Sequence, residues 1–174
     1  MIFTGFKRKS NQNFFNKRIE ELHNDLQVTN ASLVRNALIF LDDFSEKGLI
    51  LSEIREKLGL SENQIQFVIF QKKIDKKKLI PDVITVKDFG WYGNILSSEI
   101  KNLLTKEYDL LINYSKVENV FINLLILQCK TTFRVGLSHL DKRLYNLIVN
   151  CEIDDYKVFT SETQKYLRIL NKIE

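Results

Sequence analysis

The sequence predicts a three-layer α/β domain in which helices cover both faces of a mainly parallel sheet of about five strands. After Asn36, residues 37–41 form an apolar run without alternation, which is typical of a strand buried on both faces, and such strands occur mainly in parallel sheets. Strand-like and helix-like segments then alternate along the chain, which favours a layered α/β arrangement. No linker, repeat or low-complexity tract divides the 174 residues, so we expect one domain over residues 1–174.

The domain is expected to begin with an N-terminal arm and helix over residues 1–30. An amphipathic helix over about residues 12–28 is predicted by an apolar stripe at helical spacing: Phe15, Ile19, Leu22 and Leu26. This helix either packs on the domain through the stripe or, with the basic residues 7–9, lies on a membrane surface. The mixed signs of charge on its other face favour the packed helix.

The first strand leads into a predicted βαβ unit. After residues 36–41, Ser52 is a suitable N-cap for a short helix that Gly59 ends. Residues 64–70 are rich in β-branched and aromatic side chains and predict the second strand. Residues 83–86 predict a further short strand or extended segment.

The second half repeats this alternation. Ser97 or Ser98 caps a helix that reaches Thr105. The other expected elements are strands at residues 108–114, 133–137 and 144–149, a helix at residues 117–129 and a last helix capped by Thr160 or Ser161. This succession predicts a Rossmann-like or flavodoxin-like order of strands.

Polar residues follow each predicted strand, and in a parallel sheet they would share one edge, where ligands of open α/β sheets bind. They are Asp42, Asp43, Gln71, Asn113, Ser138, His139, Asn150 and Cys151. Asp42 and Asp43 suit Mg²⁺ if a third carboxylate or a substrate phosphate joins them. The alternative is that both are polar exits from a buried strand, and we favour this interpretation.

Residues 38–45 resemble the first strand and acidic pair of response-regulator receiver domains. In that family the pair helps to hold Mg²⁺ beside a phosphate-accepting aspartate at the end of a later strand. The matching strand here ends in Asn113, and a late strand expected to end in lysine ends in Asn150. An amide does not accept a phosphoryl group as a carboxylate does, so the resemblance implies a similar fold without phosphorylation.

Two loops carry residues that suit a binding partner, in a chain with a net charge of +4. The first is a basic run that either collects phosphates or is simply solvated, and its cations are Lys72, Lys73, Lys76, Lys77 and Lys78. The second covers residues 88–94. There Phe89, Trp91 and Tyr92 either stack on a base or ring, or close one edge of the core.

No catalytic set emerges from the remaining residues. Cys129 and Cys151 lie in or beside apolar segments and predict free thiols in a reducing compartment. His23 and His139 are the two imidazoles, too few for a zinc site, and no phosphate-binding glycine motif occurs. Apolar runs are too short to cross a membrane and no secretory signal begins the chain, which predicts a cytoplasmic protein.

A series of segments along nearly the whole chain is similar to a bacterial family of unknown function. The segments are residues 87–93, 108–114, 133–137 and 165–167. The resemblance implies a small cytoplasmic bacterial protein without an assigned activity. We therefore predict a non-enzymatic binding protein with a protein or RNA partner and no cofactor. The alternative is a Mg²⁺- and phosphate-dependent ligand site at Asp42 and Asp43, in a small enzyme or a degenerate receiver domain.

Overall fold

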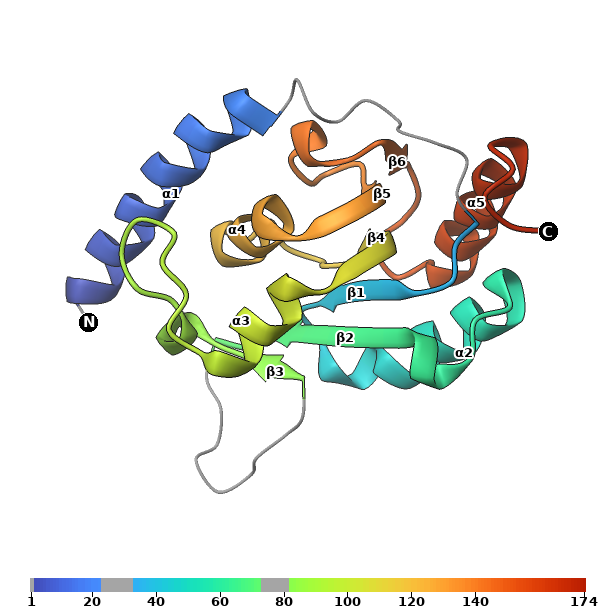
Figure 1. The fold of residues 1–174 in the computed structure, drawn as a ribbon, viewed down its shortest axis with the longest axis horizontal. Helices are drawn as coiled ribbons and strands as arrows, with labels where there is room; N and C mark the ends of the chain where they lie inside the picture. The colour runs from blue at the N-terminus through green and yellow to red at the C-terminus, as the bar shows by residue number, and fades with distance from the viewer. Residues whose placement is uncertain (1, 23–32, 73–81) are drawn as a thin grey trace.

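A computed structural model describes residues 2–22, 33–72 and 82–174. Its strands are β1 (Ala37–Leu41), β2 (Ile65–Phe70), β3 (Val83–Ile84), β4 (Glu107–Asn113), β5 (Lys130–Leu137) and β6 (Leu147–Val149). Within the described residues these six form one sheet of order β3-β2-β1-β4-β5-β6 in which every neighbouring pair is parallel (Figure 1). The α/β fold is confirmed, and the order is the Rossmann-like one. Six strands are present instead of the expected five or so, because Val83 and Ile84, within the segment predicted to be a short strand or extended, form β3 at the sheet edge.

Helices cover both faces of this sheet. They are α1 (Ile2–Leu22), α2 (Lys47–Leu58), α3 (Ser98–Thr105), α4 (Val120–Gln128) and α5 (Tyr156–Ile169). Helix α2 packs against α5, and α1 packs against α4. The chain moves from β1 to β2 in one direction and from β4 to β5 in the other, so right-handed crossovers place α2 and α4 on opposite faces.

Strand β1 forms the centre of the core, as its sequence predicted. All five of its side chains are buried, and it pairs with β2 on one side and β4 on the other. Apolar residues therefore face both helical layers without alternation, which explains the continuous run.

The packed interpretation of the N-terminal helix is confirmed. Phe15 and Ile19 are fully buried, and the helix lies on α4. The helix runs over Ile2–Leu22, ten residues earlier than the predicted start at residue 12, while Leu26 lies outside the described residues. Helix α4 is apolar on all sides because α1 covers the side that faces away from the sheet.

Two predicted helix starts were wrong. Helix α2 begins at Lys47 instead of after Ser52, because Ile50 and Ile54 already form its buried stripe. Helix α5 begins at Tyr156, where the Asp155 carboxylate accepts the Val158 N–H at 3.0 Å. The prediction at Ser97 is confirmed, since its hydroxyl accepts the Ile100 N–H at 3.3 Å.

Thr160 lies inside α5 rather than at its start. Its buried hydroxyl donates to the buried Glu53 carboxylate at 3.2 Å, and this bond joins α5 to α2. In the described part of the chain every helix is too short or too polar to cross a bilayer.

Candidate functional site

The carboxyl ends of the parallel strands share one edge of the sheet, as predicted. The strand order changes direction between β1 and β4, which is the place where ligands bind in open α/β sheets. Asp42 and Asp43 follow β1 here, and Asn113 ends β4 beside them. His139 follows β5 in the same way.

The two aspartates hold loops at this edge. The Asp42 carboxylate accepts the backbone N–H groups of Lys116 and Val117, at 2.9 and 3.0 Å, one on each oxygen. The Asp43 carboxylate accepts the hydroxyl and N–H of Ser45, at 2.7 and 2.9 Å. These Ser45 bonds lower the pKa of Asp43. Asp42 therefore stabilises the loop that follows β4, and Asp43 stabilises the turn that follows β1.

Asn113 is buried in a polar network beneath the same edge. Its Nδ2 donates to the Tyr145 hydroxyl at 2.7 Å, and its Oδ1 accepts the Ser115 hydroxyl at 2.7 Å. The Tyr145 ring lies over Gly136, where a Cβ would come within 2.8 Å of ring atoms. His139 Nε2 lies 3.0 Å from the Ser115 carbonyl oxygen. The polar side chain of Asn113 is thus already bonded to protein groups at the ends of β4 and β5.

Lys116 joins two carboxylates at the same edge of the sheet. Its Nζ lies 3.0 Å from a Glu46 oxygen and 2.6 Å from an Asp154 oxygen, and these two carboxylates raise its pKa. Burial raises the pKa of Glu46 in spite of this partner. No three His, Cys, Asp or Glu side chains among residues 2–22, 33–72 and 82–174 form a group suited to a metal ion.

Replacing Tyr145 by phenylalanine is expected to lower the free energy of unfolding by about 1–3 kcal/mol, because the buried Asn113 Nδ2 loses its acceptor. Urea unfolding of the two proteins measures the difference. Tyr156→Phe, at a half-buried tyrosine on α5, is the control. Equal stability of Tyr145→Phe and the parent protein would contradict this network.

The cysteines are free thiols, as predicted. Burial raises the pKa of the Cys129 thiol to about 12, and burial also raises the pKa of the half-buried Cys151. Thiolate is the nucleophilic form of cysteine, so neither residue is activated for covalent catalysis.

The aromatic loop, residues 85–97, offers a different surface. Phe89 pairs with Ile95 across a short antiparallel bridge, and Trp91 and Tyr92 lie at its tip. Tyr92 and Gly93 both have positive φ, of 54° and 74°, as the central residues of a type I′ turn do. Phe89 is buried and closes the core edge, while 45% of Trp91 and 71% of Tyr92 are exposed.

This loop is held by α1, although the two are about 80 residues apart in sequence. Buried Asn11 donates to the Gly90 carbonyl at 3.0 Å and accepts the Gly93 N–H at 2.8 Å. The Ser10 hydroxyl accepts the Tyr92 N–H at 3.2 Å. The Phe14 ring lies where a Cβ on Gly93 would be, at 2.3 Å from the nearest ring atom. Figure 1 shows α1 and this loop side by side.

Helix α1, which holds this loop, is rich in basic residues. It carries five basic residues against two acidic ones, which is most of the chain's excess charge. Phe6 is 61% exposed and lies one turn before Ser10, which bonds the loop. We define the aromatic–basic surface as Phe6, Arg8, Lys9, Lys17, Trp91 and Tyr92, all of which are exposed.

The predicted basic run lies almost entirely outside the described residues. Lys72 is described and exposed. Lys73, Lys76, Lys77 and Lys78 belong to residues 73–81, which are not described.

A comparison with known families identifies the family of this chain. Residues 7–170 match the profile of DUF6913, a family of unknown function. The chain belongs to the DUF6913 family. The predicted membership of an uncharacterised family is thereby confirmed, and the match spans most of α1, the whole sheet and all of α5. No curated protein and no solved structure matched the chain.

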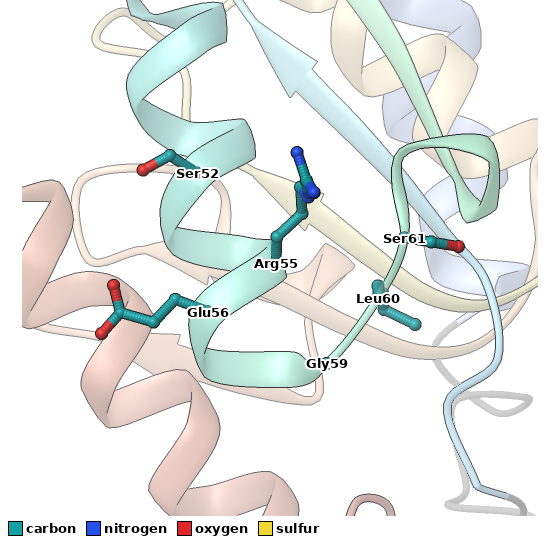
Figure 2. A pocket seen from close by; sticks show the side chains of 6 residues that line it. All are labelled: Ser52, Arg55, Glu56, Gly59, Leu60 and Ser61. Atoms are coloured by element: carbon teal, nitrogen blue, oxygen red, sulfur yellow. The ribbon is translucent and has the colours of Figure 1, made fainter.

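The described part of this DUF6913 protein also has hollows that the sequence did not indicate, two of which lie beside α2 and α3. One of about 550 Å³ is open to solvent between the end of α2 and the following turn (Figure 2). Its charged side chains, Arg55 and Glu56, have opposite signs, and both are exposed. The other, of about 580 Å³, lies between α3 and the β2–β3 edge. A sequence predicts a groove only where its pattern shows that the edge of a strand or helix stays uncovered in the fold.

Proposed function

We propose that this DUF6913 protein is a non-catalytic binding protein whose aromatic–basic surface binds single-stranded RNA. The observation that carries the proposal is the exposure of Trp91 and Tyr92 on a loop that α1 holds in place. A large aromatic residue at positive φ costs the folded state of order 1 kcal/mol, and such strain gathers at binding sites. Pre-ordered rings lose little entropy when a base stacks on them.

RNA chemistry matches the residues of this surface. Stacking of a base on an aromatic side chain contributes about 1–3 kcal/mol and works for every base. Arg8, Lys9 and Lys17 are placed on the helix that holds the rings, where they would meet phosphates. An acidic protein segment would use the same cations but would gain less from two exposed rings. The predicted cytoplasmic location and free thiols agree with an intracellular RNA partner.

The test is the fluorescence anisotropy of a labelled twelve-nucleotide oligouridine. We expect Tyr92→Gly to weaken binding about 5- to 100-fold, because it removes one stacking ring while glycine tolerates the positive φ. Trp91→Ala should have an effect of similar size. Tyr166→Ala, at a partly exposed tyrosine on α5, is the matched control and should bind like the parent protein.

The salt dependence of the binding affinity distinguishes an RNA partner from an acidic protein partner. The double variant Arg8→Ala, Lys9→Ala should reduce the slope of log affinity against log salt by about one unit for each phosphate that is no longer neutralised. The parent protein should bind polyglutamate more weakly than oligouridine. Equal affinity for both polymers would favour an acidic protein partner, and RNA affinity unchanged in both ring variants would overturn the proposal.

The alternative Mg²⁺- and phosphate-dependent site at Asp42 and Asp43 has weaker support. Both Asp42 oxygens already accept backbone N–H groups, and Asn113 is bonded to Tyr145 and Ser115. Amide chemical shifts recorded during a titration with Mg²⁺ and inorganic phosphate would decide between the proposals. A saturable response at Asp42, Asp43 and Asn113 would favour the alternative.

A further inference from the structure

Helix α1 faces the aromatic loop with a defined side. The Ser10 hydroxyl accepts the Tyr92 N–H at 3.2 Å, and the Asn11 amide bonds both Gly90 and Gly93. Asn11 is fully buried in this contact, whereas Ser10 is half-buried. Ser10 therefore marks the border at which the exposed surface of α1 meets the loop.

Three exposed residues of α1 follow this border. An α-helix turns by about 100° and rises by about 1.5 Å per residue. Lys17 therefore lies about 20° from Ser10 around the helix axis. Phe6 lies about 40° and Asn13 about 60° from Ser10, both on the same side as Lys17 and away from buried Asn11. We define the α1 ridge as Phe6, Asn13 and Lys17, which spans about 17 Å along the helix.

The α1 ridge carries a ring, an amide and a cation in that order. The Phe6 side chain is 61% exposed. Among the described residues, the Lys17 ammonium forms no ion pair and the Asn13 amide forms no hydrogen bond. The neighbouring Gln12 amide, in contrast, donates to the Asn16 side-chain oxygen at 3.0 Å. Asn13 and Lys17 are therefore available to a ligand.

This order suits a single strand of RNA that leaves the exposed rings and continues along α1. Bases stack on aromatic side chains, and phosphates pair with cations. In every nucleotide the sugar joins the base to the phosphate, so a polar residue between a ring and a cation lies beside the sugars. Asn13 has that position on the α1 ridge. At about 3.4 Å per nucleotide, about five nucleotides cover the ridge.

The ribose 2′-hydroxyl distinguishes RNA from DNA, and it both donates and accepts hydrogen bonds. The side-chain amide of asparagine does the same. We propose that Asn13 hydrogen-bonds a ribose 2′-hydroxyl and thereby makes the site selective for RNA over DNA of the same sequence. This inference rests on the proposed RNA binding and adds the choice of sugar to it.

The test compares labelled twelve-nucleotide oligouridine with oligodeoxyuridine of the same length by fluorescence anisotropy, because both present the same base. The parent protein should bind the ribose form about 3- to 10-fold more tightly. Asn13→Ala should weaken binding of the ribose form by that factor and leave binding of the deoxyribose form unchanged. A 2′-fluoro oligouridine, which keeps the sugar pucker of ribose without its hydroxyl proton, should bind like the deoxyribose form.

Two further variants show whether the effect belongs to the sugar. Lys17→Ala should weaken both oligonucleotides equally, because a phosphate contact is the same for either sugar. Asn16→Ala, at the amide that is bonded to Gln12, is the matched control and should keep the preference of the parent protein. Equal affinity of the parent protein for both sugars, or an unchanged preference in Asn13→Ala, would overturn this inference alone. Absence of binding to either oligonucleotide would overturn the proposed RNA binding as well.

Discussion

Raising the pH from 9 to 12 is expected to unfold this protein cooperatively. Burial raises the pKa of Cys129 and of Tyr108 to about 12, from ordinary values of 9.0 and 10.0. Burial likewise raises the pKa values of Tyr114 and Tyr145. All four side chains belong to the core, so their ionised forms are incompatible with the packed structure.

The direction of the effect follows from proton binding. In this pH range the folded protein keeps four protons that the unfolded chain releases. The stability they contribute is complete below the unfolded pKa values and is lost as the pH rises through the folded ones. Each group lowers the free energy of unfolding by up to about 1.4 kcal/mol per pH unit. Together their effect is of the same order as the stability of an ordinary domain.

Circular dichroism and phenolate absorbance during an alkaline titration measure this unfolding. The helical signal and the ionisation of the buried tyrosines should change at the same midpoint. Tyr108→Phe should move that midpoint to higher pH, because the Tyr108 hydroxyl is buried without a hydrogen-bond partner. Tyr92→Phe, at an exposed tyrosine, should leave it unchanged. Ionisation of all tyrosines before any loss of helical signal would contradict this expectation.

Replacing Asn11 by alanine is expected to detach the aromatic loop from α1 and to lower the free energy of unfolding by about 2–4 kcal/mol. The substitution leaves the Gly90 carbonyl and the Gly93 N–H without partners in a buried region. An unsatisfied buried group costs about 1–3 kcal/mol. The bond from Asn11 Nδ2 to the Lys7 carbonyl is lost as well.

Trp91 is the single tryptophan of the chain, so its emission reports directly on this loop. Asn11→Ala should shift that emission to longer wavelength and weaken oligouridine binding, because the two exposed rings are no longer held in place. Asn16→Ala removes an exposed bond to Gln12 on the same helix and is the matched control. Unchanged stability and emission in Asn11→Ala would show that α1 does not position the loop.

The strands could be predicted because a strand that is buried on both faces has a continuous run of apolar residues in the sequence. The β1 run, the β-branched segment of β2 and the polar residues after each strand all occur where the structure has them. Helix starts were less predictable, since several residues can cap a helix and packing selects among them. Thr160 has a capping side chain, but Phe159, which precedes it, already lies on the buried face of α5, so the helix begins earlier.

The sequence predicted the candidate surfaces only in part, because they depend on contacts between residues far apart in the chain. Exposed aromatic residues were expected around two glycines, and the positive φ of Gly93 agrees with that. The bonds from Asn11 to this loop span 79 and 82 residues, and no local pattern indicates a contact at that distance. The hollow beside α3 is lined by residues from two strands and two helices, which only the assembled fold brings together.

The position of α1 also has a consequence for synthesis of the chain on the ribosome. Helix α1 is made before the residues that secure it: those of the aromatic loop emerge about 80 residues later and those of α4 about a hundred residues later. At common translation rates that interval lasts about 5–20 s. Phe15 and Ile19 face water throughout it. Helix α1 thus lacks its packing partners during this interval, when chaperones or premature aggregation would act on its apolar stripe.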